Sequence, residues 1–244
     1  MDIRFINEQT IMIYFKNEIT EVTYHIVMSM MDWISEKNIS EIQDIVPSYR
    51  AILIYFDNHV ITASKLIENL ELTKFDDKNI IDVNQRKRII KIPVRYGGEF
   101  GPDIEEVAEY NQISTKQVIE KHTNRPYLIY MLGFMPGFPY LGGLDESLHT
   151  PRRNEPRLKI KAGSVGIANN QTGLYPLDSP GGWQIIGRTP VIVFSSKRNP
   201  MTLYKAGDWI QFYEIDENEY KQIEKDISEG KFNSADLVVT ENDY

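Results

Sequence analysis

Residues 133–190 are rich in glycine, proline and arginine, and this composition constrains the chain more than that of any other segment. Its first part, GFMPGFPYLGG at residues 133–143, holds four glycines, two prolines and three aromatic residues. Glycine permits backbone conformations that other residues avoid and lets a ligand approach the main chain, whereas proline fixes the backbone. We expect either a ligand-binding loop here or a cluster of structural turns under an aromatic lid.

Short apolar or alternating runs begin at Tyr127 and continue through much of the remaining sequence, with glycines and prolines between them. This pattern of short strands and turns predicts a compact β-barrel or β-sandwich. The expected strands cover residues 127–132, 164–168, 183–186, 190–195 and 209–212. A charged helix is expected after them, around residues 218–230.

The beginning of the chain has a different pattern, in which strand and helix signals alternate. Residues 11–15 and 51–56 are short apolar runs typical of strands, and apolar residues recur at helical spacing over residues 21–37. Thr62 has the position of an N-cap for a second helix, which we expect to run to Leu72. These elements predict a small α/β unit of β-α-β-α character.

A polar segment separates this unit from the rest of the chain. Residues 74–88 lack clear periodicity, so we place a domain boundary near residue 86. The predicted domains are therefore residues 1–85 and 86–244. A strand over residues 89–96 opens the second domain.

Two short helices are predicted within residues 103–122. Asp103 with Glu106, and Ser114 with Gln117, have the spacing of capping boxes. The pair also fits a DNA-binding helix-turn-helix motif. We favour a helical hairpin packed on its own domain, because the first helix and the whole chain are acidic.

Charge and composition limit the classes of partner. The net charge is −8, and residues 214–244 hold ten acidic residues against three lysines. An acidic chain is not expected to bind nucleic acid, which requires broad phosphate neutralisation. The chain has no cysteine, no signal peptide and no apolar run of transmembrane length, so we expect a soluble, cytoplasmic protein with no membrane partner.

A local basic patch contrasts with this overall acidity. Arg152, Arg153 and Arg157 are interleaved with Pro151 and Pro156, and the guanidinium fork matches carboxylate and phosphate geometry. The alternative is a solvated loop with surface ion pairs such as Arg153–Glu155. We favour a small anionic ligand, which must be held without a phosphate loop, since the sequence has no G-x-x-x-x-G-K-[ST] motif.

The four histidines show no metal-binding spacing, so no zinc site is predicted. His149 lies beside the arginine segment and is a candidate general base. His122 is the candidate catalytic residue. It ends a predicted helix, where a favourable interaction with the helix dipole is the alternative explanation.

Several ordered motifs together resemble the 5-oxoprolinase B-subunit family, also called the allophanate hydrolase subunit 1 or sporulation-kinase-inhibitor family. They are IPVRYGGEFGPDIEEVA, the helix ending in His122, YLIYMLGFMPGFPYLGGL, TPRRNEPR, AGSVGIANNQTGLYP and SPGGWQIIGRTP. The resemblance implies the α+β class, with a small ferredoxin-like N-terminal α/β domain and a C-terminal cyclophilin-like β-barrel. The chain departs from the family pattern at Lys161, where proline is expected, and at Asn169–Asn170, which replace a more glycine-rich turn.

The resemblance also implies an activity and partners. Together with the C-subunit, which binds directly, and the A-subunit, such a chain opens 5-oxo-L-proline to L-glutamate using ATP with Mg²⁺, at a site shared with the partner. The alternatives are a non-enzymatic inhibitor of a sporulation-type histidine kinase and a subunit of a urea carboxylase/allophanate hydrolase system.

Under this interpretation we expect three groups of site residues. Arginines bind phosphate and the substrate carboxylate, an amide and a hydroxyl contact the lactam, and a pocket of aromatic residues and one proline excludes water. The arginines are Arg152, Arg153, Arg157 and Arg188, the polar pair is Gln171 and Thr172, and the pocket residues are Phe134, Pro136, Phe138, Tyr140, Tyr175 and Trp183.

Overall fold

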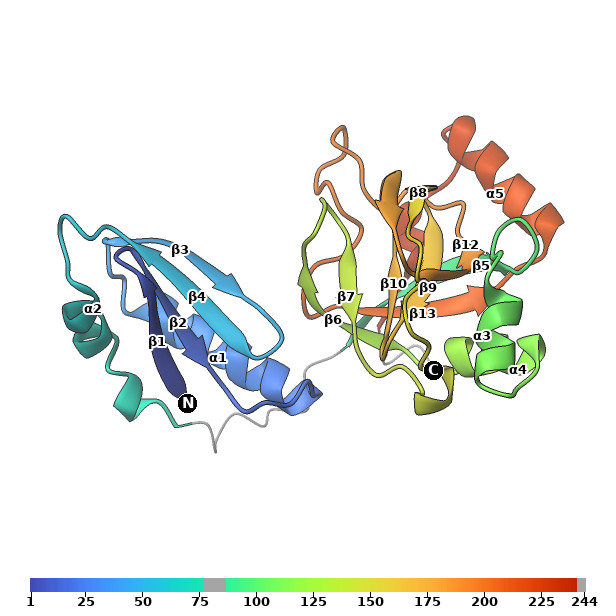
Figure 1. Cartoon of the computed structure of the whole chain (residues 1–244). Coiled ribbons are helices and arrows are strands. Elements are labelled where there is room, and N and C mark those ends of the chain that lie inside the picture. The colour runs from blue at the N-terminus through green and yellow to red at the C-terminus, as the bar shows by residue number, and fades with distance from the viewer. Residues whose placement is uncertain (77–86, 241–244) are drawn as a thin grey trace. The chain divides into compact units, whose positions relative to one another are not determined.

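The computed structural model describes residues 1–76 and 87–240, and the chain divides into two compact units, Met1–Gln85 and Arg86–Tyr244 (Figure 1). The boundary that we predict near residue 86 lies in residues 77–86, outside the described residues. No helix in the described part of the chain is both long and apolar enough to cross a membrane.

The N-terminal unit is a four-stranded antiparallel sheet with two α-helices, and the strand order is β1-β2-β4-β3. Its elements are β1 (Asp2–Asn7), β2 (Thr10–Tyr14), α1 (Glu21–Glu36), β3 (Ile42–Pro47), β4 (Ala51–Phe56), α2 (Ala63–Leu70) and the 3₁₀ turn η1 (Leu72–Lys74). The succession β2-α1-β3-β4-α2 is that of a ferredoxin-like domain without its last strand, and β1 supplies the fourth strand from the N-terminal side. The predicted ferredoxin-like unit is confirmed.

Both helices of this unit begin where the sequence places them. The Thr20 side chain caps α1, and the Thr62 side chain caps α2 by accepting a hydrogen bond from the backbone N–H of Lys65. The strands β1 and β3, in contrast, are not predicted. They form the two edges of the sheet, and their residues are mostly exposed or half-buried, so they lack the apolar run that identifies β2 and β4.

The C-terminal unit is a closed seven-stranded barrel in the order β5-β12-β9-β10-β7-β6-β13, with β13 returning to β5. The barrel strands are β5 (Arg88–Tyr96), β6 (Tyr127–Leu132), β7 (Pro139–Leu141), β9 (Ser164–Ala168), β10 (Gln171–Leu174), β12 (Gln184–Arg188) and β13 (Trp209–Glu214). A ribbon of β8 (Arg157–Ile160) and β11 (Ser179–Gly181) is separate, and β14 (Val238–Thr240) adds to one end of β5. The predicted cyclophilin-like barrel, and with it the α+β class, is confirmed.

Three helices and two 3₁₀ turns accompany the barrel. They are α3 (Ile104–Tyr110), α4 (Thr115–Thr123), η3 (Glu146–Leu148), α5 (Glu217–Ser228) and η4 (Ser234–Leu237). The predicted Ser114–Gln117 capping box starts α4. Val107 of α3 and Val118 of α4 are fully buried in the same core as the barrel strands, so the hairpin packs on its own domain as we expect.

One predicted strand is wrong, because residues 190–195 form a loop with a single isolated bridge between Phe194 and Thr202. The backbone hydrogen bonds of this segment run to the nearby residues Met201 and Leu203, and the Arg198 side chain adds further hydrogen bonds within the same loop. The Arg198 guanidinium donates hydrogen bonds of 2.7–3.2 Å to the carbonyl oxygens of Ile192, Val193, Pro200 and Met201. Apolar periodicity alone did not reveal this local pairing.

Candidate functional site

The loop between β6 and β7 carries an aromatic side chain on strained backbone. Phe134 has a φ of +66°, in the left-handed region that bulky residues rarely adopt, and is 67 % exposed. Four residues later, Phe138 is buried. Strain of this kind costs roughly 1–3 kcal/mol and concentrates at ligand-binding sites. The loop therefore has the character of a binding element.

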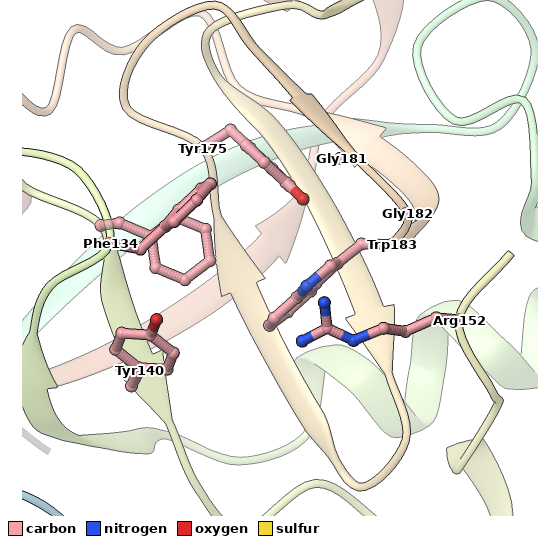
Figure 2. Close-up of a pocket in the computed structure, with 8 residues that line it drawn as sticks. Phe134, Tyr140, Arg152, Tyr175, Gly181, Gly182 and Trp183 are labelled. Carbon is pink, nitrogen blue, oxygen red and sulfur yellow. The ribbon is translucent and has the colours of Figure 1, made fainter. Parts of the chain in front are cut away.

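A pocket of about 90 Å³ opens beside this loop (Figure 2). We call it the aromatic pocket, and it is lined by Phe134, Phe138, Tyr140, Arg152, Tyr175, Gly181, Gly182 and Trp183. Phe138 is its centre, with edge-to-face contacts to the other four rings at centroid distances between 5.2 and 5.7 Å. The structure thus brings together five of the six predicted pocket residues, whereas Pro136 is exposed and outside the lining.

Glycines hold the walls of the aromatic pocket close together. A Cβ atom on Gly173 would lie 2.9 Å from Cζ3 of Trp183, and one on Gly181 would lie 2.5 Å from the Tyr175 hydroxyl oxygen. Gly181 and Gly182 are lining residues that we did not name from the sequence. The signal was present, because a Gly-Gly pair directly precedes the pocket's tryptophan.

Arg152 is the charged group of this pocket. Its Cζ lies 5.8 Å from the ring centroid of Trp183, and it has no hydrogen bond or ion pair to any described residue. Burial raises the pKa of Tyr175 to about 12, against the opposing effect of Arg152, so this phenol stays neutral. The pocket therefore offers a free cation, a neutral hydroxyl and apolar ring walls to a small ligand.

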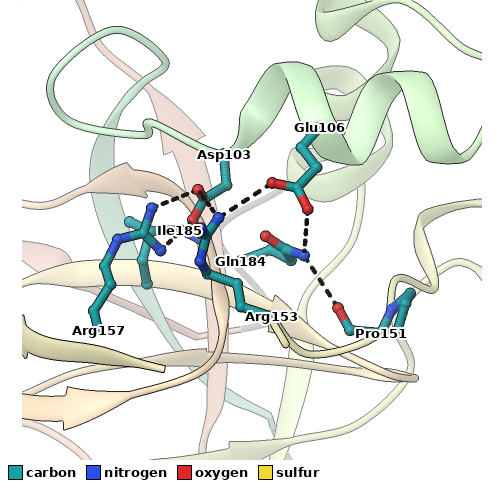
Figure 3. Close-up of polar contacts among 7 residues, drawn as sticks. All are labelled: Asp103, Glu106, Pro151, Arg153, Arg157, Gln184 and Ile185. Atoms are coloured by element: carbon teal, nitrogen blue, oxygen red, sulfur yellow. Dashed lines mark hydrogen bonds and ion pairs between the residues drawn. The ribbon is translucent and has the colours of Figure 1, made fainter. Parts of the chain in front are cut away.

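Asp103, just before α3, is the centre of a buried charge network (Figure 3). Its carboxylate accepts two hydrogen bonds from Arg157, at 2.6 and 2.8 Å, and one from Arg153 at 2.9 Å. The backbone N–H of Ile185 donates a fourth at 2.6 Å. The capping box predicted for Asp103 and Glu106 is therefore wrong, because the Asp103 side chain makes no capping hydrogen bond and binds these donors instead.

The four predicted arginines consequently do not meet at one site. Asp103 pairs with both Arg153 and Arg157, and Glu106 pairs with Arg153 as well, so these contacts hold the start of β8 and the segment before it against α3. Arg152 belongs to the aromatic pocket, and Arg188 lines a different pocket together with Arg157. Asp103 itself was missed as an ionic partner, because its arginines lie 50 and 54 residues away in sequence.

His122 and Thr172 are fully buried inside the barrel. The Thr172 hydroxyl donates to the Gly166 carbonyl, so it accepts a hydrogen bond of 2.7 Å from Nε2 of His122, and Nδ1 then accepts one of 2.8 Å from the Tyr96 hydroxyl. Burial lowers the pKa of His122 to about 3. A neutral, enclosed imidazole cannot reach a substrate in this structure, and we assign His122 and Thr172 a structural role in place of the predicted site roles.

The remaining polar candidates lie outside the aromatic pocket. Gln171 is half-buried on β10, and the half-buried His149 has its Nε2 3.3 Å from the Leu144 carbonyl oxygen. Among the described residues, no three His, Asp or Glu side chains converge into a group that could hold a metal ion. The candidate site is therefore the aromatic pocket, with Arg152 as its cationic group.

Comparison with known proteins gives the family of this chain. A family model described as "Carboxyltransferase domain, subdomain C and D" matches residues 1–204. The chain is 41 % identical to the 5-oxoprolinase B-subunit of Bacillus subtilis over 223 residues, covering 88 % of this chain and 93 % of that protein. The chain belongs to the 5-oxoprolinase B-subunit family.

More distant relatives of this family share its architecture. The fold of this 5-oxoprolinase B-subunit homologue matches the crystal structure of TTHA0988 with a TM-score of 0.73 and 30 % identity, over 86 % of this chain and 40 % of that one. The Kluyveromyces lactis urea amidolyase structure matches over 98 % of this chain and 16 % of its own, with a TM-score of 0.75 and 21 % identity, which shows the fold alone. The urea amidolyase of Lachancea kluyveri is 27 % identical over 75 % of this chain and 12 % of its own length.

Proposed function

We propose that this chain is a subunit of an ATP-dependent 5-oxoprolinase that opens 5-oxo-L-proline to L-glutamate. The name and 41 % identity of the Bacillus subtilis relative support this proposal. The observation that carries it is Arg152, a guanidinium without a carboxylate partner among the described residues, at a pocket with aromatic walls (Figure 2). 5-Oxo-L-proline has a carboxylate that matches the guanidinium and a five-membered ring that matches the aromatic walls.

Three groups of the substrate have counterparts in the pocket. Arg152 would bind the carboxylate, the rings around Phe138 would pack on the lactam ring, and the neutral Tyr175 hydroxyl would donate to the lactam oxygen. Phe134, on its strained and exposed backbone, would close over the ligand and exclude water. These residues bind and orient the substrate.

A lactam is a stable amide, so ring opening needs activation. ATP would supply the phosphoryl group that activates the lactam oxygen; water then attacks the adjacent carbon, the C–N bond breaks, and glutamate, ADP and phosphate leave. Among the described residues, the lining of the aromatic pocket contains no carboxylate or histidine to act as a general base. We therefore propose that the C-subunit, bound directly, completes the site, that the A-subunit joins the complex, and that Mg²⁺ enters with the ATP phosphates.

The test is reconstitution of the chain with its A- and C-subunits, followed by measurement of glutamate formed from 5-oxoproline with and without ATP. Omission of this chain should abolish ATP-dependent glutamate formation. Arg152→Gln should raise the KM for 5-oxoproline by about tenfold or more, since a charge-assisted hydrogen bond contributes roughly 1.5–3 kcal/mol. Arg4→Gln, on an exposed arginine of the N-terminal unit, is the matched control. Unchanged kinetics in Arg152→Gln would remove Arg152 from the site.

A urea-carboxylating system is the second candidate, and the relationship to the Lachancea kluyveri urea amidolyase favours it. Its test uses the same assembled subunits with a biotinylated carrier domain, ATP, bicarbonate and urea. Carboxylation of urea, with no glutamate formed from 5-oxoproline, would replace the first proposal by this one.

A further inference from the structure

The ribbon of β8 and β11 contributes to two pockets. β11 supplies Gly181 to the aromatic pocket, and β8 supplies Arg157 and Lys159 to a second pocket of about 140 Å³. We call the second one the basic pocket, and its polar lining residues are Glu99, Arg157, Lys159, Lys161, Ser164 and Arg188. Four of these six side chains are cationic, and none of the six lines the aromatic pocket.

Strand pairing places two of these residues, and a further arginine, in one row across the barrel. Arg188 of β12 is directly opposite Ser164 of β9 on one side and Arg95 of β5 on the other. Directly opposed residues of antiparallel strands project from the same face, and like charges in such positions are destabilising. Neither arginine has a carboxylate within 4.0 Å among the described residues, and the buried Nε of Arg95 has no hydrogen-bond partner. An anion bound here would relieve this repulsion.

The Arg188 guanidinium is held in a fixed orientation. Its Cζ lies 4.8 Å from the ring centroid of Phe100 and 5.9 Å from that of Tyr220, and its Nε donates a 3.3 Å hydrogen bond to the Tyr220 hydroxyl. Its two terminal nitrogens have no hydrogen-bond partner among the described residues. A stacked guanidinium of this kind presents a planar fork of donors and loses little further entropy on binding.

The turn before β9 brings two more donors to the same place. Gly163 has a φ of +83°, and a Cβ atom there would lie 2.3 Å from the Thr189 carbonyl oxygen and 3.4 Å from Cγ of Arg188. Only glycine lets this turn pack so closely on the arginine. It positions Lys161, which has no ion pair to a described residue, and Ser164, whose side-chain hydroxyl has no hydrogen-bond partner in the described part of the chain.

The acidic neighbours do not neutralise all of these cations. Asp103 pairs with Arg157, and Asp178 pairs with Lys159 at 2.8 Å. Glu99 is the one carboxylate among the described lining residues, and its side chain is exposed. Lys161 and Arg188, the two lining cations without an ion pair to a described residue, therefore leave an excess of positive charge facing the pocket.

We propose that the basic pocket binds a phosphate-type oxyanion, held by the Arg188 guanidinium fork, the Lys161 ammonium and the Ser164 hydroxyl. Three donor groups from different directions suit a dianion with three acceptor oxygens better than they suit a planar carboxylate. The anion is either free phosphate or the phosphate of a nucleotide. This site does not depend on the lactam and is separate from the carboxylate site that we propose at Arg152.

The test is calorimetric titration of the full chain with inorganic phosphate, with pyrophosphate and with ATP, at constant ionic strength maintained with chloride. Lys161→Gln should weaken binding by about tenfold or more, because a charge-assisted hydrogen bond is lost. Ser164→Ala should weaken it about fivefold, as expected for loss of a neutral donor. Lys225→Gln, at an exposed position of α5, is the matched control and should bind as the wild type does.

The outcomes separate the possible ligands and sites. Tighter binding of ATP than of phosphate identifies a nucleotide, whereas equal binding identifies free phosphate, and both support the site. No heat beyond the chloride control overturns the proposal, as does wild-type affinity in both Lys161→Gln and Ser164→Ala. Arg152→Gln should keep its phosphate affinity. Loss of affinity there, without loss in Lys161→Gln, would move the anion to the aromatic pocket and overturn the proposal while leaving the 5-oxoprolinase assignment intact.

Discussion

Replacement of Asp103 by asparagine should strongly destabilise the barrel. The Asp103 side chain is 3 % exposed and accepts four hydrogen bonds, three from arginines and one from a backbone N–H. Asparagine has nearly the same shape, but it removes the negative charge and turns a donor toward the guanidinium groups of Arg153 and Arg157. Both arginines are then left without their buried partner.

The expected magnitude follows from this burial. Breaking a buried ion pair by removing one partner costs about 3–5 kcal/mol. Arg153 and Arg157 are 29 % and 27 % exposed, so water can partly solvate them, and we expect a loss of about 3 kcal/mol, at the lower end of that range. For a unit of this size the melting temperature should then fall by roughly 6–12 °C.

Urea unfolding followed by tryptophan fluorescence measures this loss. Trp33 belongs to the N-terminal unit, whereas Trp183 and Trp209 belong to the barrel, so a Trp33→Phe background makes the signal specific for the barrel. Glu106→Gln is the control, because Glu106 is 56 % exposed and its contact with Arg153 is worth less than about 1 kcal/mol. A loss below about 1 kcal/mol in Asp103→Asn would refute our account of a buried charge centre.

Three further perturbations test other parts of the structure. The pKa of His122 is about 3 in the folded chain, against about 6.5 for the free side chain, so the unfolded state binds more protons below pH 6.5. The free energy of unfolding measured in urea should therefore fall by about 2 kcal/mol from pH 7 to pH 5. This pH dependence should disappear in His122→Gln. Gly101→Ala should lower the melting temperature sharply or prevent folding, because a Cβ there would lie 1.9 Å from the Ile186 carbonyl oxygen. Phe134→Gly should change stability by less than about 1 kcal/mol while raising the KM for 5-oxoproline, since it relieves backbone strain and removes the proposed lid.

The elements that sequence predicts well are those with a local signal. β6 and β9 are predicted with the same bounds that the structure shows, since buried barrel strands are apolar runs bounded by turn residues. The helix caps at Thr62 and Ser114 are equally local. The exposed edge strands of the N-terminal sheet carry no such signal. The loop at residues 190–195 has an apolar run that misleads, because its backbone bonds to the adjacent residues 201–203 and to the Arg198 side chain and joins no barrel strand among the described residues.

The candidate site shows the same limit. Glycines and aromatic residues predicted a shaped pocket at residues 133–143, and five aromatic side chains do converge there. Sequence spacing gave no means of dividing the arginines between ligand and scaffold, because the decisive acid is Asp103, about fifty residues away along the chain. Burial also removed His122 from the surface, which a helix-end position does not reveal. Charge pairing over long sequence distances is therefore the information that the chain's local patterns lack.

This division of charge makes the arginines distinguishable by experiment. Arg153 and Arg157 share Asp103, so their loss leaves a buried carboxylate short of partners and should appear as lost stability. Arg152 and Arg188 have no carboxylate partner among the described residues and face two pockets on one ribbon, so the loss of either charge should appear mainly as lost affinity for an anion. Measuring stability and anion affinity for Arg152→Gln and for Arg157→Gln in parallel separates these two effects. Equal losses of stability in the two variants would mean that Arg152 is also part of the scaffold and that the aromatic pocket has no free cation to offer a substrate.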